Sequence, residues 1–306
     1  MAANNTNIYV PCTLHTCPIS EAPIPYQPDL GANAVFLAIF ASALVIQLGL
    51  GIFYRTWSHL IGMGGGLLLE IAGYAGRIQL HTNPFVFNAF VQYLVCLTVA
   101  PAFISAVVYL CFYRITLIYG HSLLRIKPRI LAFIFITSDV VCLVLQAAGG
   151  AITAMSGGTS QQAMAGRNNG INTMISGLVL QVISLFVFLG CALYYMWHVR
   201  CKGLVPGPAA LQSRSWKGFL TSLAIATIAI FIRSVYRVAE LREGFQSGLA
   251  GNEVAFMILE GAMIVIATIC LSVFHPGCCL GVPWRLKSTG PDVVLRIRND
   301  SQNALQ

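Results

Sequence analysis

The chain has 306 residues, of which 57% are hydrophobic and 9% are charged, and its mean hydropathy is +0.76. A soluble globular domain carries about 25% charged residues, so this composition excludes a sizeable soluble domain. The formal net charge of +8 would suggest a nucleic-acid partner in a soluble protein, but in a membrane protein the positions of Lys and Arg report topology. We therefore expect an all-α integral membrane protein without a nucleic-acid partner.

Seven segments have about 20 apolar residues, the length that a spanning helix needs. They are predicted at 33–54, 60–80, 85–113, 130–154, 171–198, 216–241 and 252–275. Pro101 lies inside the third segment, where it is expected to remove one backbone hydrogen bond and to kink the helix. The predicted organisation is an extracellular tail at 1–32, a membrane domain at 33–280 and a cytoplasmic tail at 281–306.

The basic residues lie mostly on one side of the predicted membrane. Thirteen of the 18 fall after the first, third and fifth segments or in the C-terminal tail: Arg55, Arg114, Arg125, Lys127, Arg129, Arg200, Lys202, Arg214, Lys217, Arg285, Lys287, Arg296 and Arg298. Because cytoplasmic loops carry the excess of Lys and Arg, the N-terminus is predicted outside and the C-terminus in the cytoplasm. The glycosylation sequon at Asn4 would then lie outside, as would Cys12 and Cys17, which either form a disulfide or stay as thiols.

The stretch between residues 231 and 277 is apolar enough to lie in a bilayer, yet it carries several ionisable side chains. The spacing of Arg233, Arg237 and Glu240 puts them on one face of the sixth segment, and Glu253 and Glu260 are seven residues apart in the seventh. Ionisable groups at membrane depth are energetically costly and mark functional sites. We expect the two charged faces to meet, so that Arg233 or Arg237 pairs with Glu253 or Glu260. An ion-pair network that only locks the two helices together fits the same pattern.

Polar residues in two other segments are predicted to lie at the same level. Glu70 and Arg77 are seven residues apart in the second segment, as are Asp139 and Gln146 in the fourth. At about 1.5 Å of rise per residue, these groups fall at the centre or in the outer half of the membrane. A common cavity that opens outward or sideways would keep them solvated or paired. Alternatively, Glu70 and Asp139 pair with an arginine or stay protonated in the core.

Familiar catalytic motifs are absent from the sequence. It contains neither the P-loop pattern G-x-x-x-x-G-K-[ST] nor H-E-x-x-H. The six His residues fall in the N-terminal tail or near helix ends and are not spaced as a zinc cluster. We therefore expect no enzymatic activity, no catalytic residue, no metal site and no cofactor.

Short motifs occur in six of the seven predicted helices, from the second to the seventh. They are EIAGYAGR at 70–77, APAF at 100–103, Asp139 with QAAGG at 146–150, Gly177 with Gln181, RSVYR at 233–237 with Glu240 and Gly244, and Glu253 and Glu260 with HPG at 275–277. Together they resemble the fungal lipid-translocating exporter family, the seven-helix proteins of the resistance-to-aminocholesterol type. The resemblance covers about residues 33–280. It departs from the family at Glu260, where Asp is expected to be common, and at Leu241, where an aromatic residue is frequent.

The resemblance implies an association with sphingoid long-chain bases, sterol-like toxic amphiphiles and, in one branch of the family, porphyrins. It favours a transporter or translocator in the plasma membrane whose partners are membrane lipids or lipid-like amphiphiles. The candidate substrate-binding residues are Glu70, Arg77, Asp139, Gln146, Gln181, Arg233, Arg237, Glu240, Glu253 and Glu260. Carboxylates in this set would receive a cationic head, and the arginines would hold the carboxylates or bind anionic groups.

A seven-helix receptor or lipid sensor is the alternative. An outer N-terminus and basic cytoplasmic loops fit a signalling receptor equally well by topology. The predicted cytoplasmic loops and tail are short, however, and receptor-type motifs are absent. Transport is therefore the favoured hypothesis, with the oligomeric state left open.

Overall fold

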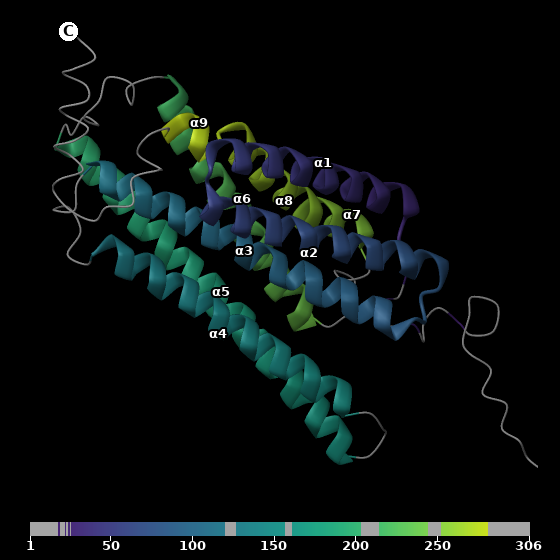
Figure 1. Cartoon of the computed structure of the whole chain (residues 1–306). Coiled ribbons are helices and arrows are strands. Elements are labelled where there is room, and N and C mark those ends of the chain that lie inside the picture. Colours follow the sequence, from purple (N-terminus) through teal and green to yellow (C-terminus); the bar gives the residue numbers. More distant parts are fainter. Residues whose placement is uncertain are drawn as a thin grey trace, which may run out of the picture.

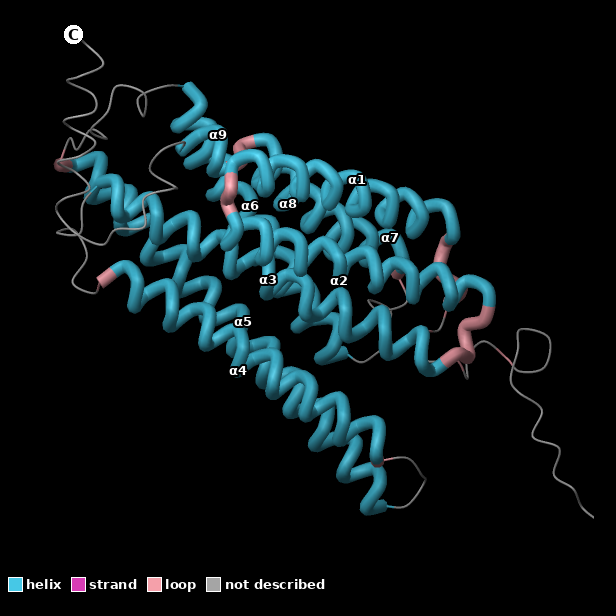
Figure 2. The backbone as a smooth tube through the Cα atoms, viewed as in Figure 1, coloured by secondary structure: helices cyan, strands magenta, loops and turns pink. Residues whose placement is uncertain are grey.

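The computed structural model describes residues 18, 22, 24, 26–119, 127–156, 161–202, 214–243 and 252–280. Helices make up almost all of these ranges, and no strand occurs within them (Figure 2). The helices are α1 (Leu30–Tyr54), α2 (Trp57–Thr82), α3 (Phe87–Tyr119), α4 (Pro128–Met155), α5 (Gln161–Cys201), α6 (Arg214–Glu243), α7 (Glu253–Phe256), a π-helical turn (Met257–Ala262), α8 (Met263–Val273) and α9 (Pro276–Leu280). The tails beyond the described residues hold Asn4, Cys12 and Cys17, so the expectations for these three residues lie outside this description.

Each of the first six predicted segments lies in one long helix of the structure to within two residues, and the seventh covers α7, the π-helical turn and α8. Six of the helical spans are long and apolar enough to cross a membrane: α1, α3, α4, α5, α6 and the continuous span Glu253–Cys279. The remaining segment is α2, which has 26 residues but is less apolar, because it carries Glu70, Arg77 and several glycines. The chain is therefore an integral, multi-pass membrane protein.

The long helices run back and forth side by side (Figure 1). α1 begins at the right-hand end of this view, and the short α9 lies at the left-hand end. α2 packs against both α1 and α3, α4 packs against α5, and α6 packs against α8. The described chain thus begins and ends at opposite ends of the bundle.

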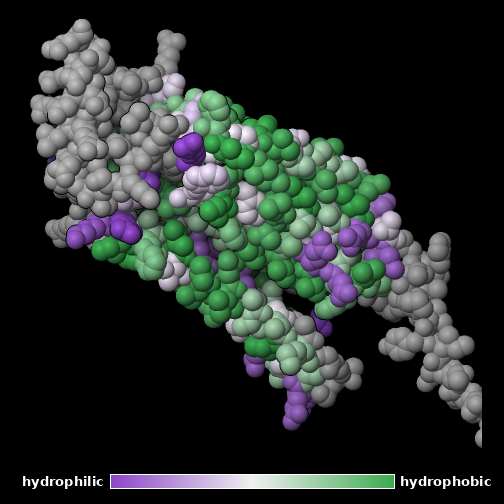
Figure 3. Space-filling model, in the orientation of Figure 1, coloured by the Kyte–Doolittle hydropathy of each residue, from purple (hydrophilic) through white to green (hydrophobic). Residues whose placement is uncertain are grey.

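Exposed apolar side chains cover the long helices. Leu, Ile, Val and Phe residues make most of the visible surface around α1, α2 and α3 hydrophobic, whereas hydrophilic residues gather toward the ends (Figure 3). Inside the bundle, the rings of Tyr109, Phe135 and Phe188 join α3, α4 and α5, with centroids 4.6 to 5.5 Å apart. This pattern is what a bilayer requires, since hydrocarbon replaces water around the outer faces.

The helix α5 is longer than the sequence predicts. The predicted segments 130–154 and 171–198 leave residues 155–170 as a loop between them, but α5 begins at Gln161 and has 41 residues. At 1.5 Å per residue it is about 60 Å long, roughly twice the hydrocarbon thickness of a bilayer. Hydropathy locates only the part of a helix that lies in hydrocarbon, and residues such as Gln161, Gln162 and Arg167 favour helix without being apolar.

The helices α4 and α5 form a hairpin in which the two backbones touch. A Cβ atom at Gly149 would lie 2.6 Å from the carbonyl oxygen of Gly170, and one at Gly170 would lie 2.3 Å from Oγ1 of Thr153. Small residues allow this approach, as at many helix contacts in membranes. Away from α9, this hairpin diverges from the rest of the bundle (Figure 1).

Candidate functional site

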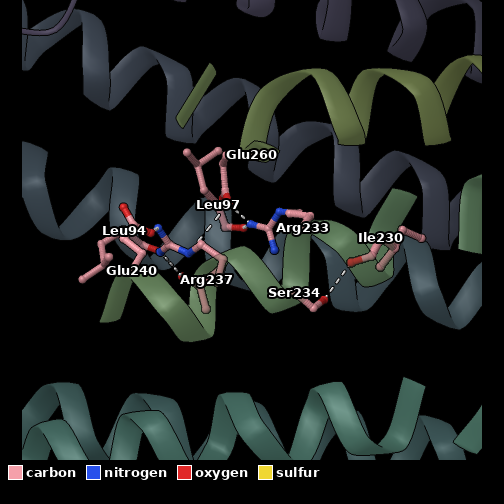
Figure 4. A network of polar contacts seen from close by, with 9 residues as sticks. Leu94, Leu97, Ile230, Arg233, Ser234, Arg237, Glu240 and Glu260 are labelled. Atoms are coloured by element: carbon pink, nitrogen blue, oxygen red, sulfur yellow. Dashed lines mark hydrogen bonds and ion pairs between the residues drawn. The ribbon is translucent and has the colours of Figure 1, made fainter. Parts of the chain in front are cut away.

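Arg233 on α6 and Glu260 in the π-helical turn form a buried ion pair. Nη2 of Arg233 donates a hydrogen bond to Oε1 of Glu260, and the two side chains are 4% and 2% exposed (Figure 4). This contact confirms the predicted pairing between the last two spans. It joins α6 to the π-helical turn at a depth where neither charge reaches solvent.

The same guanidinium also binds the backbone of α3. Nη2 of Arg233 donates to the carbonyl oxygen of Leu97. In a regular helix, that carbonyl would accept from the N–H of residue 101, but Pro101 has no N–H to donate. Pro101 therefore leaves one carbonyl inside the membrane domain without its helical donor, and Arg233 supplies the missing hydrogen bond.

Arg237 lies one helical turn further along α6. Nη1 donates to Oε2 of Glu240 at 2.6 Å, and Nη2 donates to the hydroxyl of Thr98 on α3 at 3.1 Å. Nε lies 3.9 Å from Oε2 of Glu260, so Glu260 faces both arginines of α6. The predicted face of α6 is thus intact, although Arg237 takes its closest carboxylate from its own helix.

Arg77 on α2 is 1% exposed and has partners in three other segments. Nη2 lies 3.5 Å from Oε1 of Glu253, and Nε donates to Oδ1 of Asn33 at 2.8 Å. Nη2 also donates to the hydroxyl of Tyr26 at 3.1 Å, and the guanidinium lies 3.9 Å from the centroid of the Phe256 ring. Burial raises the pKa of Tyr26 above its usual 10, which keeps its hydroxyl protonated against Arg77.

Glu253 and Glu260 bind different arginines, although their spacing predicts one shared face. Glu253 lies against Arg77 and accepts from the backbone N–H of Asp29 at 2.7 Å, whereas Glu260 faces α6. The π-helical turn begins at Met257, between the two glutamates, and contains Glu260. A π turn holds more residues than an α turn, so a seven-residue spacing no longer returns to the same face. Pairing of Arg233 or Arg237 with Glu253 was therefore the wrong alternative.

Glu70 on α2 is a carboxylate that none of these arginine–glutamate ion pairs includes. Its side chain is 2% exposed, and it interacts electrostatically with Arg233, Arg237 and Glu260. Among the described residues, no Lys, Arg or His nitrogen lies within 4 Å of it, and its Oε1 has no hydrogen-bond partner. One turn along α2, the buried hydroxyl of Tyr74 is also without a partner.

We call this assembly the charge cluster: Glu70, Arg77, Arg233, Arg237, Glu240, Glu253 and Glu260. It contains three arginines and four glutamates. Each arginine has one closest glutamate, through the pairs Arg77–Glu253, Arg233–Glu260 and Arg237–Glu240. The cluster therefore has one more acidic group than basic groups, and Glu70 is the unmatched one.

The other three predicted site residues lie on the α4–α5 hairpin. The hydroxyl of Ser105 on α3 donates to Oδ2 of Asp139 at 2.7 Å, so Asp139 lies at the α3–α4 contact, apart from the charge cluster. Nε2 of Gln146 donates to Oε1 of Gln181 at 3.3 Å, which links α4 to α5. Of the three, Gln146 comes nearest to the arginines, because it lines a small cavity with Arg237 and Glu240.

The side chains of the charge cluster pack against one another and against α3, although an open polar cavity was expected. The cavity beside Arg237 and Glu240 has a volume of about 20 Å³, which is room for about one water molecule. A groove of about 450 Å³ lies between α1 and α8, and its lining contains none of the predicted site residues. In this conformation the arginines bind carboxylates and the α3 backbone in place of solvent.

Sequence reasoning missed the partners that are uncharged. Asn33, Tyr26 and Thr98 bind the arginines but carry no charge that would single them out. Two features of the sequence pointed to uncharged partners of the arginines: the polar Asn33 within an apolar helix, and Pro101, which frees a backbone carbonyl. Tyr74 gave no signal, because a tyrosine on a helix face is common in membrane proteins.

Comparison with known proteins identifies relatives over most of the chain. The family model described as RTA1 like protein matches residues 63–282. The chain is 31% identical to the sphingoid long-chain base transporter RSB1 of Saccharomyces cerevisiae over 82% of this chain and 72% of that protein. It is 29% identical to Protein RTM1 over 74% and 69% of the two chains, and 25% identical to Protein RTA1 over 82% and 84%, both from Saccharomyces cerevisiae.

No solved structure matches the chain, so the arrangement described above rests on no structural relative. The matched family region begins in α2 and ends just past α9, and it contains all ten predicted site residues. It covers well over half of the chain, as does the alignment with RSB1. These matches agree with the resemblance drawn from the short motifs, and the chain belongs to the RTA1-like protein family.

Proposed function

We propose that this protein transports amphiphilic lipids with a cationic head, such as sphingoid long-chain bases, across or out of the plasma membrane. Membership of the RTA1-like family supports this proposal, as does 31% identity to a protein named as a sphingoid long-chain base transporter. The proposal includes the predicted topology, with seven spans, an outer N-terminus and a cytoplasmic C-terminus. Resistance to toxic amphiphiles would follow from their removal from one leaflet.

The observation that carries the proposal is the unmatched carboxylate of Glu70. Breaking a buried ion pair typically costs about 3–5 kcal/mol because one charge is left without compensation. A primary ammonium head next to Glu70 would supply that compensation, since its three N–H donors suit a carboxylate with a free oxygen. The charge cluster would then hold four acidic and four basic groups.

The arginines have a positioning role in this proposal. Arg233 holds Glu260 and the α3 backbone, and Arg237 holds Glu240 and Thr98, so neither guanidinium is available to a substrate. Their charges keep Glu240 and Glu260 matched, which leaves Glu70 as the acceptor for an incoming cation. We expect the bound head to lie between α2 and the π-helical turn.

A carboxylate-to-amide change tests the role of Glu70. Purified protein in proteoliposomes is loaded with a long-chain amine or with the neutral alcohol of the same chain length, and flux between leaflets is measured. Glu70→Gln should lower amine flux about tenfold or more, which corresponds to about 1.4 kcal/mol or more, and should affect the alcohol much less. Asp139→Asn is the matched control, because Asp139 is a buried carboxylate outside the charge cluster.

One result would count against the role of Glu70, and another against transport itself. Equal loss of amine and alcohol flux would mean that Glu70 acts on folding and not on the head. Absence of flux for every amphiphile in the wild-type protein, with ligand-dependent signalling in cells, would favour the receptor or sensor alternative.

A further inference from the structure

A groove with a volume of about 450 Å³ runs between α1 and α8. Its lining includes the small residues Ala38, Ser42 and Ala43 of α1 and Ser272 of α8. Small-molecule sites typically have volumes of about 300–1,000 Å³, so the groove has the size of a ligand site. The polar atoms near Ser42 and Ser272 are largely satisfied within the helices, because each hydroxyl donates to the carbonyl four residues earlier.

The rims of the groove face outward and are apolar. Val35 and Ile46 of α1 are 57% and 53% exposed, and Ile269 and Val273 of α8 are 51% and 67% exposed. Such side chains on spanning helices contact the hydrocarbon of the bilayer. The groove is therefore open to a hydrocarbon chain arriving from the membrane.

An aromatic pair, Phe36 of α1 and Tyr74 of α2, links the groove-lining helix α1 to the helix that carries Glu70, and we call this pair the aromatic partition. The ring of Phe36, next to the groove residue Val35, stacks on Tyr74 with centroids 5.2 Å apart. A Cβ atom at Gly261 would lie 2.7 Å from the Tyr74 hydroxyl and 2.8 Å from Cζ of Phe36. Only the missing side chain of Gly261 lets both rings lie against the π-helical turn, beside Glu260.

Two buried hydroxyls along this path have no hydrogen-bond partner. Thr268 lines the groove and is 1% exposed, and its Oγ1 is unpartnered. Tyr74 is also 1% exposed, and its hydroxyl is likewise unpartnered. Unsatisfied buried polar groups are uncommon and call for a ligand or another partner.

We propose that this groove binds the hydrocarbon tail of a single-chain cationic amphiphile, whose head passes Phe36 and Tyr74 to reach Glu70. The apolar and small residues that line the groove suit a hydrocarbon tail, and the donors of an ammonium or hydroxyl head match the free oxygens of Tyr74 and Glu70. This inference rests on the proposed function and adds the position of the tail and the route of the head.

The test uses a long-chain amine that carries a photoreactive diazirine near the end of its tail. The full chain is reconstituted in vesicles of a two-chain phospholipid, irradiated and digested, and the labelled residues are located by mass spectrometry. We expect labels on the groove-lining residues of α1 and α8, and competition by unlabelled amine but not by added phospholipid.

Two variants of α1 separate the groove from the outer face of the same helix. Ser42→Leu fills the groove and removes only a hydrogen bond within α1, whereas Val45→Leu adds bulk at an exposed position outside the groove. Ser42→Leu should lower groove labelling about tenfold, and Val45→Leu should leave it unchanged. Labels spread over several outer helices, or equal competition by phospholipid, would overturn the inference.

Amine flux is measured on the same vesicles, which separates this inference from the proposed function. Flux with labels away from the groove overturns the tail site and leaves transport standing. Competed labelling in the groove without wild-type flux overturns the proposed transport, while the groove stands as a binding site for this class of amphiphile.

Discussion

Arg233 donates a hydrogen bond to the carbonyl oxygen of Leu97, which Pro101 deprives of its helical donor. A proline inside a helix normally destabilises it by about 3 kcal/mol. Here the freed carbonyl becomes the backbone anchor of an arginine that also binds Glu260. Pro101 therefore helps to hold Arg233 in the charge cluster, although its own side chain has no polar atom.

Pro101→Ala tests this role of the proline. Alanine restores an N–H to α3, and this N–H competes with Arg233 for the Leu97 carbonyl. We expect the usual gain in helix stability to be partly cancelled and amine flux to fall about tenfold, as measured by thermal unfolding in detergent and by flux in proteoliposomes. Pro128→Ala is the control, because Pro128 begins α4, where a proline frees no carbonyl. Unchanged flux with a full gain in stability would remove Pro101 from the mechanism.

The Arg233–Glu260 pair predicts a rescue by double substitution. Arg233→Gln or Glu260→Gln alone leaves a buried charge without its partner, which typically costs about 3–5 kcal/mol of stability. The double variant Arg233→Gln/Glu260→Gln removes both charges and should recover part of the folded yield, measured by size-exclusion chromatography. A double variant no better than either single one would argue against direct pairing.

Asn33 predicts an unusual effect of a hydrophobic substitution within the membrane. Asn33→Leu makes α1 more apolar, yet it removes the acceptor of the Arg77 Nε hydrogen bond. Leaving that buried donor unsatisfied should cost about 1–3 kcal/mol or slightly more, because the donor is charged. Thermal unfolding in detergent measures the loss, with Ser42→Ala, at an exposed position of the same helix, as the control. Increased stability of Asn33→Leu would mean that Arg77 does not depend on this contact.

Gly261→Ala tests the aromatic partition. The added methyl group would press on the Tyr74 hydroxyl and on Phe36, so both rings must shift. We expect lower amine flux with groove labelling retained, because the tail site lies on the membrane side of the partition. Gly190→Ala is a suitable control, since a Cβ there meets no atom within 4 Å. Normal flux in Gly261→Ala would exclude a route past these rings.

The predicted topology has its own measurement. Thirteen of the 18 basic residues lie on the predicted cytoplasmic side, so Asn4 should be accessible from outside and a tag after Gln306 only from the cytoplasm. Protease protection of sealed cells reports the side on which Asn4 lies, and the same measurement on inside-out vesicles reports the side of the C-terminal tag. Protection of both termini on the same side would refute seven spans.

The sequence predicts the helices and the charged faces well, because both follow from spacing. Arg233, Arg237 and Glu240 recur at helical intervals, so their common face could be inferred from that segment alone. The partner of Glu253 could not be inferred in this way. The π-helical turn changes the directions of the side chains that follow it in the last span, and Arg77 comes from a helix distant in sequence.

Packing explains the remaining differences. A polar cavity was inferred from the number of charges, but Thr98, Asn33 and a free carbonyl satisfy the arginines without solvent. The excess of one glutamate could be counted from the sequence only after the pairs were known. Likewise, the first turns of α5 follow helix propensity and not hydropathy, so the hydrophobic pattern missed them.

The backbone contact at Gly149 and Gly170 holds α4 and α5 together as a unit that is distinct from the other helices. Helices that touch through their backbones cannot slide or separate without breaking close contact, so we expect α4 and α5 to move as one rigid body. Their links to α3 and α6 are side-chain contacts and are sparser. A rocking motion would therefore use the hairpin as its moving arm and widen the seam that borders Gln146, Arg237 and Glu240. The 20 Å³ cavity lies on that seam, so it is where such a motion would first admit a larger molecule.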